Sequence, residues 1–281
     1  MRFRIGEVYS DSVASIRKSP TVLLPAVMTV LAPLLLGLLF YAAGSSYTGP
    51  YLHDGSRQLD SDEFAVFGLF MLAFVILSVL FYAWMTQVAA AAVREGAVSF
   101  RGALRLIGPG TLRVVLSEII IGLIFLGAGV IYLIIMMSAG DSNASVVASA
   151  IITVALMIAA WAFFSLVPTA CAYENIGPVK SLSAGTAAAR PAFWSMVGFL
   201  VVTALGIGAV TFLAGIVAWA FGTGDAAMVA SMVIDGAVNV ATTTFFALAL
   251  THVYAWLRRA PDGETVREEE PPGFSEYPPV L

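Results

Sequence analysis

Six long hydrophobic runs alternate with short polar segments along the chain. Each run exceeds the roughly 20 residues that an α-helix needs to cross the ~30 Å hydrocarbon core of a bilayer. The pattern therefore predicts an all-α integral membrane protein with six transmembrane helices. The runs cover residues 21–43, 64–92, 114–139, 144–170, 194–221 and 226–257.

Three of the polar segments share a layout, in which an amphipathic stretch leads to a proline and then to a span. Apolar residues recur in them at helical spacing, and proline breaks the helical hydrogen-bond ladder before the span begins. We expect three hairpin units, at residues 5–92, 97–170 and 178–257, each preceded by a short amphipathic helix. These helices either lie in the membrane interface or cap the bundle. The prolines are Pro20, Pro109 and Pro191.

Composition supports the membrane assignment. The chain is 59% hydrophobic and 11% charged, with a mean hydropathy of +0.91, against roughly 45–50% and 25% in soluble domains. The single cysteine excludes an intramolecular disulfide and a cysteine-based metal cluster. The transmembrane domain is expected to end at residue 257, and the acidic, proline-rich segment 258–281 reads as a disordered tail or a docking peptide.

Basic residues indicate the orientation, because short loops rich in Lys and Arg stay in the cytoplasm. Thirteen of the fourteen lie on one side of the predicted spans, and only Arg57 lies on the other. We expect a multi-pass protein of the cell membrane with both termini in the cytoplasm. The basic residues expected at the interface are Arg17, Lys18, Arg101, Arg105, Arg113, Lys180 and Arg190.

A polar stripe marks the sixth span. Asp235, Asn239 and Thr242 follow i, i+4, i+7 and share one helix face. Gln87 and Glu118 are further polar residues at membrane depth. Ionisable residues at membrane depth are costly, so they are candidates for a functional site. The stripe either binds a cation, a proton or a lipid headgroup, or forms an interhelical hydrogen-bond network. Glu118 either reaches water, pairs with an interfacial basic residue or has a functional role.

Glycine and proline predict local packing. Gly122 and Gly129 are spaced by seven, as are Gly208, Gly215 and Gly222, and both rows predict grooves that pack the protein's own helices. Proline residues 25 and 33 predict a kinked first span, and Pro168 a bend at the end of the fourth.

No catalytic constellation is recognisable, and we expect neither enzymatic activity nor a cofactor. The leading hypothesis is a membrane module that organises lipids or partner proteins through its interfacial helices. Its alternative is a small transporter or channel component that uses the polar stripe, and an intramembrane enzyme is a more distant third. Expected partners are membrane lipids and other membrane proteins, not nucleic acid. The oligomeric state is not written in the sequence.

Two segments carry a resemblance to a known family. "SLVPTACAYENIGPVKSLSAGTAAARPAFW" (165–194) and "VAAAAVREGAVSFRGALRL" (88–106) are similar in layout to the six-helix membrane domain attached to glycerophosphoryl diester phosphodiesterases and found alone in prokaryotic membrane proteins. The resemblance implies a membrane module, and no catalytic residue carries over. The usual basic residues between Lys180 and Arg190 are replaced by "SLSAGTAAA", which weakens an anionic-lipid role for the third unit.

Overall fold

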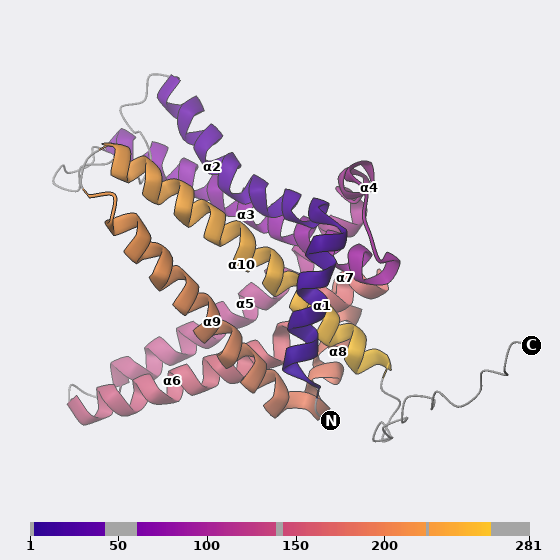
Figure 1. Cartoon of the computed structure of the whole chain (residues 1–281). Coiled ribbons are helices and arrows are strands. Elements are labelled where there is room, and N and C mark those ends of the chain that lie inside the picture. Colours follow the sequence, from indigo (N-terminus) through magenta and orange to yellow (C-terminus); the bar gives the residue numbers. More distant parts are fainter. Residues whose placement is uncertain (1–2, 43–60, 139–142, 223–224, 260–281) are drawn as a thin grey trace, which may run out of the picture.

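The protein is a bundle of long helices (Figure 1). The computed structural model describes residues 3–42, 61–138, 143–222 and 225–259, and no strand occurs among them. Five helices are long and apolar enough to cross a membrane, and the number rises to six if the bent pair at the N-terminus counts as one span. The all-helical, multi-span class is confirmed, whereas the count of six stays a prediction. The long helices are α2 (Leu24–Ala42), α3 (Ser61–Glu95), α5 (Pro109–Ser138), α6 (Asn143–Phe164), α9 (Phe193–Trp219) and α10 (Asp225–Arg259).

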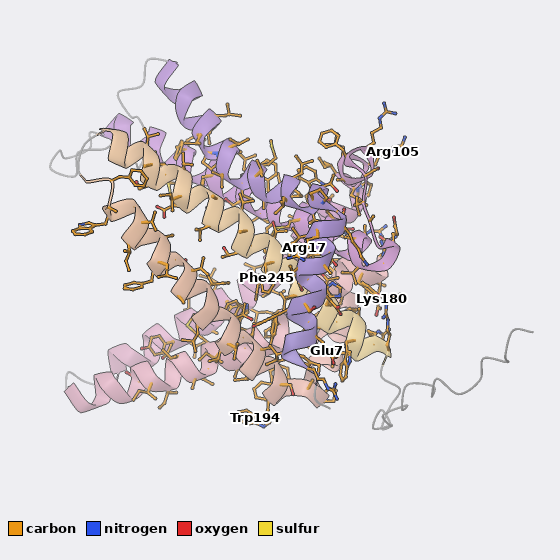
Figure 2. The ribbon with its side chains drawn as sticks, in the orientation of Figure 1. Glu7, Arg17, Arg105, Lys180, Trp194 and Phe245 are labelled. Carbon is orange, nitrogen blue, oxygen red and sulfur yellow. The ribbon has the colours of Figure 1, made fainter. Side chains whose placement is uncertain are left out.

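Short helices gather at one end of the bundle, which we call the basic end; the opposite end is the distal end (Figure 1). Arg17, Arg105 and Lys180 lie at this end (Figure 2). α10 continues two residues past the expected domain boundary at 257, and residues 260–281 of the expected tail lie outside the described part. The short helices are α1 (Ile5–Lys18), α4 (Phe100–Arg105), α7 (Leu166–Glu174) and α8 (Pro178–Ala189).

Prolines interrupt the helices near the basic end. α1 meets the next helical segment at an angle of 100°, and the 3₁₀ turn Pro20–Leu23 forms the junction. The Ser19 hydroxyl accepts a hydrogen bond from the Val98 amide at 2.9 Å and donates one to the Val98 carbonyl at 3.1 Å. α6 and α7 are separated at Ser165, three residues before Pro168, where the proline ring removes a donor and crowds the preceding turn. The sequence predicted a bend at this end of the span; the helix is interrupted there, while residues 151–174 form one apolar stretch long enough to cross a membrane.

The three amphipathic helices are not equivalent. α1 lies against α9 and α10, where the Tyr9 ring contacts Phe245 at 5.2 Å and Ser15 hydrogen-bonds His252 at 3.0 Å. α8 packs on α7. On α4, Ala103 is buried but Phe100 and Leu104 are 55% and 42% exposed; α1 and α8 also expose one large apolar residue each, Val13 and Val179. The packing of α1 and α8 on other helices fits the capping alternative, the exposed residues of α4 fit the interfacial alternative, and both stay predictions.

Burial is concentrated at the basic end. The side chains from Ala83 to Ala92 on α3 are all buried, as are those from Leu166 to Ala172 on α7. In the distal halves, Leu126, Ile151 and Phe212 are 64%, 65% and 70% exposed. Figure 1 shows the α5–α6 pair diverging from the other long helices toward the distal end. The distal apolar surfaces are thus available to lipid chains, and the basic end holds the core.

The predicted glycine grooves are wrong for the described glycines. A Cβ added at Gly122, Gly129, Gly208 or Gly215 would meet nothing within 4 Å. The closest approach at a described glycine is at Gly185 on α8, where an added Cβ would lie 2.7 Å from the Val167 Cα of α7.

Candidate functional site

A cleft of about 570 Å³ opens between α9 and α10, with α3 and α6 completing its walls. Threonines, one amide and one carboxylate alternate in it with apolar and aromatic side chains. Its volume falls within the ~300–1,000 Å³ of small-molecule sites. The lining residues are Tyr82 of α3; Trp161 of α6; Leu200, Thr203, Ala204, Ile207 and Thr211 of α9; and Asp235, Val238, Asn239, Thr242, Thr243 and Phe246 of α10.

The structure brings together three of the five candidate polar residues. Asp235, Asn239 and Thr242 all line the cleft, and Phe246 extends the same stripe of α10 by one further turn. Positions separated by four, three and four residues lie one above another on a helix. The local pattern alone therefore places these side chains on one wall.

Gln87 and Glu118 do not belong to this cleft. Gln87 is buried near the basic end of α3. Its side chain lies against Gly110 of α5, where an added Cβ would be 3.3 Å from the Gln87 Nε2 atom. Glu118 has a buried Oε1 without a hydrogen-bond partner among the described residues. The ion pair considered for Glu118 is not formed there, and Arg113 instead donates to the carbonyl and side-chain oxygens of Asn175 at 3.2 and 3.1 Å.

The threonine hydroxyls of the cleft are oriented by their own helices. Thr242 donates to the Val238 carbonyl at 2.7 Å, and Thr243 donates to the Asn239 carbonyl at 2.6 Å. Such bonds to the preceding turn use the hydroxyl proton. The free lone pairs remain, so both side chains offer hydrogen-bond acceptors.

Asp235 is the single charged residue of the lining. It lies ten residues into α10, and it carries no hydrogen bond or ion pair within the described part of the chain. The interhelical network proposed as an alternative for the polar stripe is therefore not formed at Asp235. A carboxylate at membrane depth is costly without a compensating partner, so its surroundings favour a positively charged occupant.

The cleft is open near Asp235 and closed toward the basic end. Asp235, Asn239 and Thr211 are exposed, whereas Leu200 and Thr203 are 2% and 4% exposed. The Thr203 hydroxyl donates to the Phe199 carbonyl at 2.7 Å and forms a 2.7 Å hydrogen bond with the Tyr9 hydroxyl of α1. α1 therefore covers the floor of the cleft.

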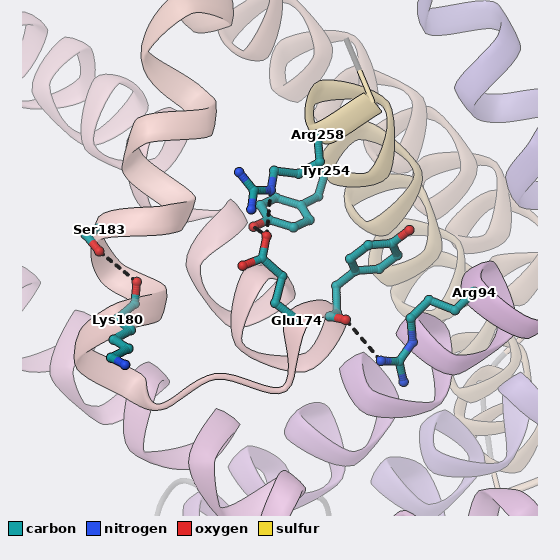
Figure 3. A network of polar contacts seen from close by, with 7 residues as sticks. Arg94, Glu174, Lys180, Ser183, Tyr254 and Arg258 are labelled. Carbon is teal, nitrogen blue, oxygen red and sulfur yellow. Dashed lines mark hydrogen bonds and ion pairs between the residues drawn. The ribbon is translucent and has the colours of Figure 1, made fainter. Parts of the chain in front are cut away.

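A polar network joins α7 to α3 and α10 (Figure 3). The Glu174 carboxylate at the end of α7 accepts a hydrogen bond from the Tyr254 hydroxyl at 2.5 Å and pairs with Arg258 Nε at 2.6 Å. Arg94 of α3 donates to the Tyr173 carbonyl at 3.0 Å. We call these residues the Glu174 network. The sequence offered one signal for it, an acid at the basic end of a span, but not the identity of its partners.

The predicted interfacial basic residues do lie at the basic end. Arg17 and Lys18 close α1, Arg101 and Arg105 belong to α4, and all four are exposed. Among the others, Arg113, Lys180 and Arg190 are also exposed, and Arg113 holds the loop after α7 through Asn175.

Comparisons with protein-family models, with characterised proteins and with solved structures give no match for this chain. The resemblance to the membrane domain of glycerophosphoryl diester phosphodiesterases therefore stays a prediction from the two sequence segments.

Proposed function

We propose that this protein binds a small amphiphilic molecule in the cleft and moves it between the two faces of the membrane. The observation that carries the proposal is an open cleft of about 570 Å³ at membrane depth, with a carboxylate in its wall that has no partner among the described residues. The transporter alternative is thus better supported than the organising module. The activity requires no covalent chemistry, in keeping with a non-enzymatic role.

The size and lining of the cleft support an organic ligand over an inorganic ion. Ca²⁺ takes six to eight oxygen ligands at about 2.3–2.6 Å, and Mg²⁺ needs a compact octahedral shell. A single carboxylate in a wide cleft with Trp161, Ile207 and Phe246 on its walls does not suit such ions. Apolar walls with few polar groups are typical of sites for organic molecules.

The closed basic end supports a transport cycle with one side sealed. α1 and the Glu174 network hold this end together, while the distal halves diverge. We propose six spans in three units, with both termini in the cytoplasm of a cell-membrane protein, because basic loops are retained there. The cleft then faces the outer leaflet and exchanges with the inner leaflet when the basic end opens.

Translocation can be measured with the purified chain in vesicles that contain phosphatidylethanolamine labelled on its acyl chain with a nitrobenzoxadiazole dye. Dithionite reduces only the dye in the outer leaflet unless the protein exchanges lipid between leaflets. We expect reduction to extend to the inner-leaflet dye. Ala204→Trp, which fills the cleft, should slow this exchange, and Ala209→Trp should not, because Ala209 lies on α9 outside the lining. Equal reduction with and without protein would refute translocation.

The side of the membrane from which the cleft is accessible can be tested separately. Ala204→Cys, combined with Cys171→Ala, places a single thiol in the cleft, because Cys171 is the chain's one cysteine. A membrane-impermeant maleimide should label it in whole cells from outside. Labelling only in inverted vesicles would overturn the proposed orientation.

The lipid-organising role remains a second candidate because of α4. Phe100, Leu104 and Ile107 are 55%, 42% and 55% exposed, with Arg101 and Arg105 beside them. Apolar side chains flanked by arginines suit an anionic membrane surface. Replacing Arg101 and Arg105 by Gln should weaken protein-dependent clustering of phosphatidylglycerol if this role holds, and leave dithionite-detected exchange unchanged.

A further inference from the structure

We propose that the ligand of the cleft is an amphiphile whose head is a primary ammonium group. This inference rests on the proposed function and adds the class of molecule. It follows from the charge of the cleft, from the type of hydrogen-bonding group around Asp235 and from the distance between Asp235 and the aromatic floor.

The charge of the cleft lining favours a cationic head group. Asp235 is the one ionisable carboxylate in the lining, and no cationic side chain lines the cleft beside it. A head group that is only anionic would meet this carboxylate without a basic partner. Like charges brought together in a binding site cost several kcal/mol. A cationic head instead supplies the partner that the described chain does not provide.

The hydrogen-bonding groups around Asp235 favour a primary ammonium over a quaternary one. The Thr242 and Thr243 protons are used by backbone carbonyls, and the Asp235 carboxylate is an acceptor. Together with the Asn239 amide oxygen they form a stripe rich in acceptors. A primary ammonium offers three N–H donors to such a surface, whereas a quaternary ammonium offers none and is bound mainly by aromatic faces.

The aromatic pair lies too deep to hold the same head group. The Trp161 and Phe246 rings are 5.9 Å apart, and Phe246 lies eleven residues beyond Asp235 on α10. At 1.5 Å per residue this separates the two levels by about 16 Å along the helix. The rings therefore suit the apolar body of the ligand, and Asp235 suits its head.

Two sources can supply such a molecule. One is a membrane lipid with an amine headgroup, such as phosphatidylethanolamine, and the other is a free long-chain amine. Both present a primary ammonium attached to an apolar body. The experiment separates them by the composition of the bilayer.

The test uses the full chain with Cys171→Ala and Ala204→Cys in phosphatidylcholine nanodiscs, and follows maleimide labelling of the introduced thiol. Decylamine, decyltrimethylammonium, decanol and decanoate are titrated separately. We expect decylamine to slow labelling at concentrations at least tenfold below those of the other three. Ala209→Cys in place of Ala204→Cys reports on α9 outside the cleft and should show no protection. Repeating the measurement in phosphatidylethanolamine nanodiscs gives protection without added amine if the lipid is the source, and none if a free amine is.

Substitutions at Asp235 complete the test. Asp235→Asn should abolish the tenfold preference for decylamine, and Asp235→Glu should retain most of it. Glu118→Gln removes a second membrane-depth acid outside the cleft and should leave the preference unchanged. Equal protection by decylamine, decyltrimethylammonium and decanol would overturn the ammonium assignment but keep the amphiphile cleft. Protection by none of the four compounds, in either bilayer, would overturn the proposed function as well.

Discussion

Replacing Gly185 by alanine is expected to separate α7 from α8. A Cβ at this position would lie 2.7 Å from the Val167 Cα, 2.8 Å from its backbone nitrogen and 2.9 Å from its Cγ2. Two of these three atoms belong to the backbone and cannot move away by rotation of a side chain. The two helices must therefore shift apart.

The size of the effect follows from two opposing contributions. Inserting a methyl group into a well-packed site costs roughly 1–3 kcal/mol, and a backbone obstacle favours the upper part of that range. Alanine gains up to about 1 kcal/mol over glycine in helix propensity. Gly185→Ala should therefore lower the free energy of unfolding by about 2 kcal/mol. Gly206→Ala on α9, where a Cβ meets nothing within 4 Å, should keep or raise it.

Reversible denaturation of the purified chain in mixed micelles, followed by tryptophan fluorescence, measures these differences. Val167→Ala removes the Cγ2 contact but keeps the Cα and the backbone nitrogen, so it should not restore the stability of Gly185→Ala. Full rescue by Val167→Ala, or unchanged stability of Gly185→Ala itself, would show that the backbones of α7 and α8 are not in close contact.

Two further predictions concern the basic end. Glu174→Ala should cost about 2–3 kcal/mol of unfolding free energy, because it leaves the buried Tyr254 hydroxyl without its charged acceptor. Glu7→Ala removes a surface ion pair between Arg4 and Glu7, whose side chains are 72% and 60% exposed, and it should cost under about 0.5 kcal/mol of unfolding free energy. Equal losses in Glu174→Ala and Glu7→Ala would contradict the role of the Glu174 network. Trp84→Phe removes the 2.8 Å hydrogen bond from Trp84 Nε1 to the Ala103 carbonyl, and it should increase proteolytic cleavage or hydrogen exchange in α4 without a comparable change in α8.

The long helices were predictable because a bilayer imposes a simple rule on the sequence. Runs of apolar residues longer than a membrane crossing indicate helices wherever they occur. The observed α3 and α10 cover their predicted runs, and α5 and α9 end one and two residues before theirs. The break between α6 and α7 lies where the sequence predicted a bend, because a proline disturbs the helix through its own covalent structure. Positions separated by three and four residues placed Asp235, Asn239 and Thr242 together for the same local reason.

Packing was harder to predict. The glycine rows had the spacing of helix contacts, but spacing does not tell whether another helix lies opposite, and an added Cβ at these glycines would meet no described atom within 4 Å. No spacing rule pointed to Gly185, although among the described glycines it is the one whose added Cβ would lie nearest to an atom of another helix. The three amphipathic stretches had similar patterns, yet α1 packs on α10 and α8 on α7, while α4 buries Ala103 and leaves Phe100 and Leu104 exposed.

By itself the sequence determined the helical class, the position of the spans and the polar stripe of the sixth predicted span. All of these follow from local periodicity and from the cost of polar groups in hydrocarbon. The tertiary structure alone decided which polar residues meet: it excluded Gln87 and Glu118 from the cleft and added Tyr82, Trp161 and Thr203. It also joined Glu174 to Tyr254 and Arg258 across 80 or more positions of sequence. Such contacts depend on how helices from distant parts of the chain pack, and no periodicity within a single helix contains that information.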